Sequence, residues 1–262
     1  QKRQGVYRII VIGDSVAIGQ GVEYQQRFAS ILKTMLDSRD SAIRYEVIVL
    51  ARSGYSTSQE LVLLERQALP LDPDLVIWSY VLNDPADPVF HDANGQLGLY
   101  FFKPRIHLAH FVHKKLFKAR ENWHRKKCRA DFHEMLHCVY RVEVEKNIGS
   151  IAELTAERTE RGLPILFTVH PNVVSYEDYP FADLHRELVE IAGRNELYVL
   201  DLLEDFGKED VANLQQSEND PWHPNARGHH IVAQAIFERL HALKLLSEEG
   251  RGKLRSGVVN PG

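Results

Sequence analysis

Residues 6–15 read VYRIIVIGDS, an apolar run that ends in a short polar loop. The run is rich in β-branched side chains and contains one charge, Arg8, which predicts a buried β-strand over residues 6–12. Gly13 permits a tight turn directly after this strand, and Asp14 and Ser15 follow it. Because reactive groups of open parallel sheets gather where strands end and helices begin, Ser15 is a candidate for chemistry.

Apolar runs and helix-period segments continue to alternate along the chain. We expect further strands over residues 45–50, 74–79, 164–169 and 197–202, and helices over residues 25–36, 58–69, 142–161, 181–192 and 225–245. Strands that alternate with helices form right-handed βαβ units, so the sequence predicts a flavodoxin-like α/β fold, a three-layer αβα sandwich with a five-stranded parallel sheet. We expect a single domain over residues 1–246, with a helical insertion over residues 85–140 and a disordered tail over residues 247–262.

Composition argues against several classes of protein. A net charge of −4 and an isoelectric point near 6.4 do not fit a nucleic-acid-binding domain, which is normally strongly basic. The sequence has no apolar run of the roughly 18 residues that span a membrane. Its two cysteines, Cys128 and Cys138, can form one bridge in an oxidising compartment or stay reduced. Because the chain starts at Gln1, we expect an upstream segment to have been removed, which fits a periplasmic or secreted location.

Two more polar motifs follow predicted strands. Gly54, in the sequence ARSG after the second strand, lets the backbone approach a ligand closely and offer its N–H. Asn83, in YVLNDP after the third strand, carries an amide donor suited to a developing oxyanion. Each motif also has a purely structural interpretation, since Ser15 can cap a helix and Gly54 and Asn83 are common turn residues. Their weight therefore comes from their occurrence together.

A fourth motif, DPWHPN over residues 220–225, precedes the last predicted helix. A general base must reach the proton of the nucleophile while a carboxylate fixes its tautomer, and Asp220 can do this for His223 from the same loop. Pro221 and Pro224 stiffen the loop. The chain contains 13 histidines, and we expect most of the others to be ordinary surface or core residues.

In this order, the four motifs resemble those of the SGNH (GDSL-like) hydrolases over residues 7–243. The resemblance implies that Ser15 is the nucleophile, His223 the base and Asp220 the residue that orients it. It also implies an oxyanion hole made by the Ser15 and Gly54 N–H groups and the Asn83 amide. Val81 departs from the pattern, because the family usually has glycine there, and we expect only a reshaped pocket wall.

The resemblance implies a serine ester hydrolase that cleaves carboxylic esters through an acyl-enzyme and needs no metal or cofactor. Short-chain acyl and O-acetyl esters are the expected substrates. Thioesters, lysophospholipids and acyl transfer to a sugar hydroxyl remain alternatives that use the same triad. The expected partner is therefore a small-molecule, glycan or lipid ester rather than a nucleic acid.

A rival motif is HEMLH over residues 133–137, which matches the His-Glu-x-x-His pattern of zinc hydrolases. On a helix this spacing would place His133 and His137 on one face for zinc, with Glu134 as the base. No third ligand follows at a recognised spacing, so we expect instead a helix whose two histidines are exposed.

The predicted insertion is basic and aromatic. Residues 103–129 contain ten Lys or Arg and one acidic residue, Glu121. A helix there would show one apolar stripe flanked by cations, formed by Leu108, Val112, Leu116, Ala119 and Trp123. Such a helix can either pack on the sandwich or dock on an anionic membrane or polyanionic substrate. We further expect a flap over Ser15 formed by Phe90, Tyr100, Phe101 and Phe102.

Overall fold

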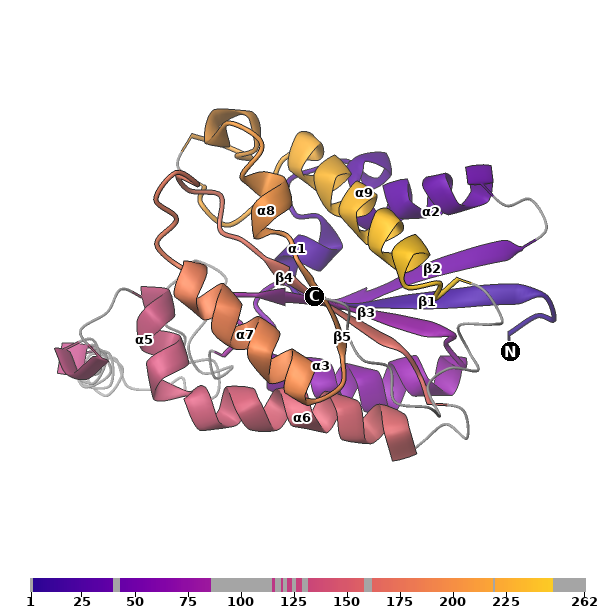
Figure 1. Cartoon of the computed structure of the whole chain (residues 1–262), viewed down its shortest axis with the longest axis horizontal. Coiled ribbons are helices and arrows are strands. Elements are labelled where there is room, and N and C mark those ends of the chain that lie inside the picture. Colours follow the sequence, from indigo (N-terminus) through magenta and orange to yellow (C-terminus); the bar gives the residue numbers. More distant parts are fainter. Residues whose placement is uncertain are drawn as a thin grey trace, which may run out of the picture.

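The computed structural model describes residues 2–39, 43–85, 132–157, 162–218 and 220–246, together with residues 115, 119, 122, 123 and 126–128. They form a three-layer αβα sandwich in which helices cover both faces of a twisted sheet (Figure 1). The fold class predicted from the sequence is thereby confirmed.

The central sheet has five parallel strands in the order β2-β1-β3-β4-β5. Their bounds are β1 Val6–Gly13, β2 Arg44–Ala51, β3 Leu75–Val81, β4 Ile165–His170 and β5 Tyr198–Asp201. Strand order reverses between β1 and β3, and at such a switch point the loops at the carboxyl ends of the strands diverge and leave a crevice. The register aligns Gly13 at the end of β1 with Ala51 of β2 and Ser79 of β3, so the loops that follow these strands open at one edge of the sheet.

Alternate residues of β1 pack on opposite helical layers. Tyr7, Ile9 and Val11 belong to a core shared with α2 Phe28–Arg39 and α9 Ala226–Ala242. Ile10 and Ile12 belong to a second core, shared with α6 Arg141–Glu157 and α7 Ala182–Arg194. This strict alternation fixes the register, because a slip by one residue would exchange the two faces. Each fully buried Ile or Leu contributes about 1.5–3 kcal/mol to folding.

Several shorter elements complete the described chain. They are α1 Ser15–Ile18, η1 Tyr24–Gln26, α3 Thr57–Leu63, η2 Leu64–Ala68, η3 Leu69–Leu71, α8 Leu203–Phe206 and η4 Val211–Asn213. The helix expected over residues 58–69 is three successive segments, α3, η2 and η3, of which η2 is a short π-helix. Pro70 lies in η3 and has no N–H to continue an α-helical pattern, which accounts for the change in helix type.

The described end of the predicted insertion is α5 Phe132–Val139, which precedes α6. A disulfide joins Cys128 to Cys138 of α5, so the bridged alternative is the one the structure contains. The predicted flap, the tail and most of the basic stretch over residues 103–129 lie outside the described residues. Of the predicted apolar stripe, Ala119 and Trp123 are described, and both are exposed. Lys127 lies over the Trp123 ring, 5.4 Å from its centroid.

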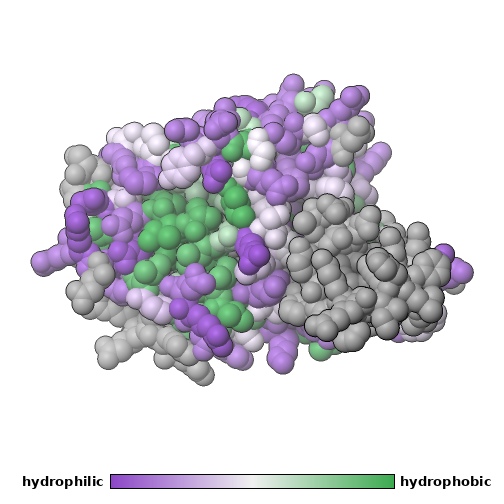
Figure 2. All heavy atoms as spheres, turned by 180° about the vertical axis from the view of Figure 1, so that it is seen from behind, coloured by the Kyte–Doolittle hydropathy of each residue, from purple (hydrophilic) through white to green (hydrophobic). Residues whose placement is uncertain are grey.

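Strand β2 forms one edge of the sheet, and its residues Val47, Val49 and Ala51 line a groove beside α2. Figure 2 shows apolar residues gathered on the face of the molecule that is turned away in Figure 1. Within the described ranges, no helix combines the length and apolar character needed to cross a bilayer.

Candidate active site

The turn that carries Ser15 is shaped by a close approach between β1 and its neighbours. A Cβ atom on Gly13 would lie 2.8 Å from the Ala17 Cβ and 2.9 Å from the Ser79 carbonyl oxygen, so only glycine fits. Asp14 then caps α1, because its Oδ1 accepts the Val16 N–H at 2.9 Å. Ser15 is the first residue of α1 and is largely buried, with 8% of its surface exposed.

Ser15 meets the polar loop from the other end of the chain. Its Oγ lies 3.1 Å from the Nε2 of His223, and the Nδ1 of His223 lies 2.8 Å from the Oδ2 of Asp220. Asp220 Oδ1 also accepts the backbone N–H groups of Trp222, at 3.0 Å, and of His223, at 3.1 Å. The structure therefore brings together all three residues predicted for the triad.

The loop that carries His223 is held on both sides. The Gln216 N–H donates to the His223 carbonyl at 3.1 Å, and the Asn225 N–H donates to the Leu214 carbonyl at 2.7 Å. On the opposite side, the Val173 N–H donates to the Pro221 carbonyl at 2.7 Å. Asn225 caps α9 through the N–H groups of Arg227 and Gly228, so the loop runs directly into a helix anchored in the core.

Asn83 lies in a tight turn after β3. Asp84 closes this turn: its Oδ2 accepts the Val81 N–H at 2.9 Å, and its own N–H donates to the Val81 carbonyl at 3.0 Å. The Thr57 N–H ties the turn to α3 by donating to the Asp84 carbonyl at 3.2 Å. These hydrogen bonds hold the turn that carries Asn83.

Gly54 lies in the loop after β2 and adopts a φ of 74°, a left-handed conformation that favours glycine. The Arg52 N–H joins this loop to the nucleophile turn by donating to the Gly13 carbonyl at 3.4 Å. Among the described residues, none accepts the Gly54 N–H. Gly54 is not part of the pocket lining, so its predicted role as an oxyanion donor stays a prediction.

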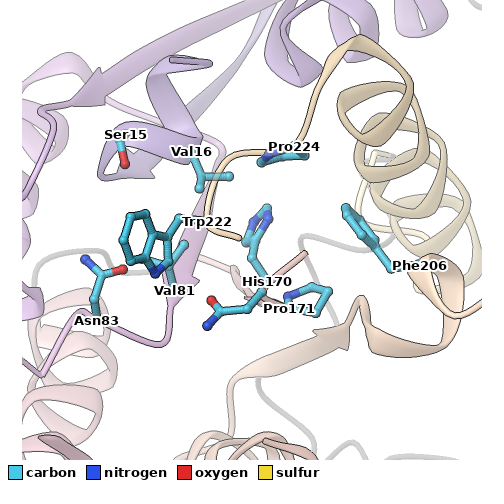
Figure 3. Close-up of a pocket in the computed structure, with 10 residues that line it drawn as sticks. Ser15, Val16, Val81, Asn83, His170, Pro171, Phe206, Trp222 and Pro224 are labelled. Atoms are coloured by element: carbon cyan, nitrogen blue, oxygen red, sulfur yellow. The ribbon is translucent and has the colours of Figure 1, made fainter. Parts of the chain in front are cut away.

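A small pocket opens beside Ser15 (Figure 3). Ser15, Val81 and Asn83 line it, as do Val16, His170, Pro171, Asn172, Phe206, Trp222 and Pro224. Val81, at the position where glycine was expected from the family pattern, forms part of the wall and is 5% exposed. Trp222 differs from the other wall residues because half of its surface, 50%, is open to solvent.

Sequence reasoning missed the residues at the carboxyl end of β4. His170 lies at the pocket with its Nε2 2.9 Å from the Ser79 Oγ and 3.1 Å from the Thr168 Oγ1. Burial lowers the pKa of His170 to about 3, so its ring is neutral and does not compete with His223 for protons. The stretch His170-Pro171-Asn172 stands at the carboxyl end of a predicted strand, and that position was the one available signal.

Two opposing effects act on the pKa of the Asp220 carboxyl group. Partial burial acts to raise its pKa, but hydrogen bonds from the His223 ring and from the N–H groups of Trp222 and His223 outweigh burial. The pKa of Asp220 is therefore below its usual value, and the carboxylate is charged at neutral pH. A charged acceptor fixes the proton of His223 on Nδ1, which leaves Nε2 free to accept the Ser15 proton.

Comparison with protein families agrees with this geometry. A model of the GDSL-like lipase/acylhydrolase family matches residues 11–231. The chain belongs to this family. Its members hydrolyse esters, so this GDSL-like protein is a carboxylic ester hydrolase. A search of curated protein sequences gives no match.

Several solved structures share the fold of this GDSL-like hydrolase. LAE5, an alpha/beta hydrolase from the metagenome of Lake Arreo, Spain, has a TM-score of 0.59 at 16% identity, covering 92% of this chain and 97% of LAE5. Axe2, an acetylxylan esterase from Geobacillus stearothermophilus, has a TM-score of 0.57 at 14% identity, covering 89% and 94%. TesA has a TM-score of 0.58 at 15% identity, covering 90% and 99%.

Three carboxyl groups lie buried behind the site of this GDSL-like hydrolase: Asp14, Glu60 and Asp84. Burial raises the pKa of each, and the mutual repulsion of the carboxyls adds to the effect for Glu60 and Asp84. The Trp78 indole faces Glu60 and acts in the opposite direction. Together these effects shift each carboxyl toward its neutral form.

The His-Glu-x-x-His motif has a different surrounding from the one expected. His133 and His137 are both buried, at 5% exposure each, so the expectation that they are exposed is wrong. His137 packs edge-on against Tyr80, with ring centroids 6.2 Å apart, and His133 packs edge-on against Phe181 at 5.2 Å. In the described part of the chain, no three His, Cys, Asp or Glu side chains group as metal ligands. The two histidines pack α5 against the sandwich.

Proposed function

We propose that this protein cleaves short-chain carboxylic esters, O-acetyl esters foremost, with a Ser15–His223–Asp220 triad. The observation that carries the proposal is the continuous hydrogen-bonded chain from the Ser15 Oγ through the His223 ring to Asp220. Ser15 and His223 stand 208 positions apart in the sequence, so ordinary local structure does not account for their contact. Their order and partners are those that nucleophilic acyl transfer needs.

The proposed reaction has two steps. His223 accepts the Ser15 proton as Oγ attacks the ester carbonyl, and the Ser15 and Gly54 N–H groups and the Asn83 amide hold the resulting oxyanion. The tetrahedral intermediate expels the alcohol, which takes the proton from His223, and leaves an acyl-Ser15 ester. Water then loses a proton to His223 and attacks this ester, and the second tetrahedral intermediate collapses as His223 returns the proton to the Ser15 Oγ. This step releases the carboxylic acid and restores Ser15 and neutral His223.

The pocket favours a small acyl group. Its enclosed part has room for a group about the size of one water molecule, and rigid side chains such as Val81, Pro171 and Phe206 line it. An acetyl methyl group fits this space, whereas a long acyl chain would have to displace several of the side chains that line it. The half-exposed indole of Trp222 at the same pocket offers an apolar platform for the alcohol part, such as the face of a sugar ring. The acetylxylan esterase Axe2 shares the fold, which supports an acetylated carbohydrate as substrate.

A panel of p-nitrophenyl esters from acetyl to palmitoyl, run beside acetylated xylooligosaccharides, tests the proposal. We expect the highest kcat/KM for the acetyl ester and a steep decline with chain length. Ser15→Ala should abolish the activity, whereas Ser38→Ala, an exposed serine of α2, should leave it unchanged. A preference for palmitoyl over acetyl esters would contradict the acetyl assignment, and full activity of Ser15→Ala would contradict the triad.

A further inference from the structure

A second histidine–aspartate pair lies behind the site. His185 of α7 is buried, at 1% exposure, and its Nδ1 lies 2.7 Å from the Oδ1 of Asp201 at the end of β5. Its Nε2 lies 3.4 Å from the Tyr179 hydroxyl, and that hydroxyl accepts the Asn172 N–H at 2.8 Å. The arrangement has the same order as the proposed triad, a hydroxyl, an imidazole and a carboxylate.

One arrangement of protons satisfies every group in this series of hydrogen bonds. Asp201 accepts the Leu203 N–H at 3.0 Å through the same Oδ1, so it is an acceptor, and His185 donates to it from Nδ1. His185 Nε2 then accepts the Tyr179 O–H, while the Tyr179 oxygen accepts the Asn172 N–H. Consecutive bonds of this kind polarise and strengthen one another in a buried setting.

This series of hydrogen bonds ends at residues 171–173, which contact both the pocket and the loop that carries His223. Asn172 lines the pocket beside Ser15, and the neighbouring Val173 N–H donates to the Pro221 carbonyl at 2.7 Å. Pro221 lies between Asp220 and Trp222, in the loop that carries His223. Val173 itself is fully buried, and its carbonyl accepts the Gln215 side-chain amide at 3.0 Å, so the segment has little freedom to move separately.

We propose that Tyr179, His185 and Asp201 are positioning residues that hold residues 171–173 and, through Val173 and Pro221, set the place of His223 relative to Ser15. None of the three lines the pocket, so they act through the segment and not on the substrate. The proposal rests on the proposed esterase function, because the position of His223 has consequences only if it acts as the base.

Tyr179→Phe removes the hydroxyl and keeps the ring, whose packing on Tyr176 and Phe181 is otherwise unchanged. Tyr176→Phe is the matched control, because Tyr176 stacks on Tyr179 with ring centroids 5.8 Å apart and its buried hydroxyl has no hydrogen-bond partner among the described residues. We expect kcat for p-nitrophenyl acetate to fall about tenfold in Tyr179→Phe, since small displacements of a base slow the reaction strongly. KM should stay within about twofold, because the loss falls on the transition state. Tyr176→Phe should keep both constants.

Deuterium exchange measured by mass spectrometry gives a readout that does not depend on turnover. Peptides covering residues 171–174 and 220–224 should exchange faster in Tyr179→Phe than in the wild type, and at the wild-type rate in Tyr176→Phe. His185→Leu removes the link at its other end, and the double variant with Tyr179→Phe should be no slower than the slower single variant if the residues act as a unit.

Wild-type kcat in Tyr179→Phe would overturn the proposal, as would equal losses in Tyr179→Phe and Tyr176→Phe or additive losses in the double variant. Unchanged exchange in both peptides would also overturn it. A wild-type protein without esterase activity would instead contradict the proposed function, while faster exchange in Tyr179→Phe would still show that the hydroxyl holds the loop.

Discussion

Ser15 Oγ has two polar neighbours at the same distance of 3.1 Å, the Oδ2 of Asp14 and the Nε2 of His223. A hydroxyl has one proton, so the two neighbours compete for it. Burial raises the pKa of Asp14, although hydrogen bonds from Val16 and Ser15 act in the opposite direction. The proposed reaction needs this proton to pass to His223.

Asn83→Ala tests the oxyanion hole at the scale of one side chain. Removing one such donor costs about a hundredfold or more in kcat, because the interaction strengthens as negative charge develops on the oxygen. We expect this loss for p-nitrophenyl acetate, with KM changed little and the melting temperature close to that of the wild type. A loss in kcat of less than about threefold would show that the amide is not a donor to the oxyanion.

Glu60→Gln tests how the buried carboxyl cluster affects the stability of the fold as the pH changes. Burial raises the pKa of Glu60 in the folded protein above its unfolded value, so its contribution to stability is present below the unfolded pKa and is lost as pH rises through the folded pKa. The variant should therefore match the wild type near pH 4 and become progressively more stable than it toward pH 8. Thermal unfolding across this range measures the difference, with Glu190→Gln on the exposed face of α7 as baseline. A pH-independent difference would contradict this explanation.

At the scale of elements, the loop over residues 220–225 depends on the first turn of α9. A Cβ on Gly228 would lie 2.5 Å from the Cβ of Pro224, directly after His223. Gly228→Ala should therefore push the loop outward, with a loss of about 1–3 kcal/mol in the free energy of unfolding and a lower kcat. Gly193→Ala in α7 is the control, because its Cβ would meet nothing within 4 Å. Denaturant unfolding and the acetyl ester assay would measure both, and an unaltered kcat in Gly228→Ala would mean that the loop tolerates the shift.

The strands were predictable to within one or two residues, because β-branched runs such as residues 6–12 are unlike the segments between them. The helix boundaries were less predictable from the sequence. The change from α3 to the π-helix η2 comes just before Pro70 in η3, and a helical period alone does not show where the helix type changes. The burial of His133 and His137 was also missed, since it depends on Tyr80 and Phe181, which come from distant parts of the chain.

At the scale of the whole molecule, we expect buried histidines to make the folded protein less stable as the pH falls. His229 of α9 is fully buried, stacks on Phe28 and accepts its N–H at 3.4 Å. Burial lowers the pKa of His229 from 6.5 to about 4, so its contribution to stability is present above the unfolded value and is lost as pH falls through the folded pKa. His229→Phe keeps the ring stack and removes the titration.

The wild type should lose stability relative to His229→Phe by up to about 1.4 kcal/mol for each pH unit between 6.5 and 4. Chemical unfolding at several pH values measures this difference. The two proteins should differ by a constant amount above pH 7, where the ring is neutral in both states. A constant difference down to pH 4 would mean that the ring protonates without cost in the fold.

The order of the polar motifs carried most of the information on the site. Four loops at the carboxyl ends of strands converge in this fold, so Ser15, Asn83, Asp220 and His223 could be placed together from the sequence. The pocket residues at the carboxyl end of β4 could not be placed, because His170 and Asn172 belong to no recognised motif and gain a role only through their position. The support from Tyr179, His185 and Asp201 is likewise a property of the folded chain.

The central claim is that Ser15 is a nucleophile activated by His223. Intact-protein mass spectrometry after incubation with a fluorophosphonate, followed by peptide mapping, tests it most directly. We predict one adduct per chain, on Ser15, which is absent in Ser15→Ala and forms at least about a hundredfold more slowly in His223→Ala. An adduct on another residue, or labelling of Ser15 at the wild-type rate without His223, would contradict the claim.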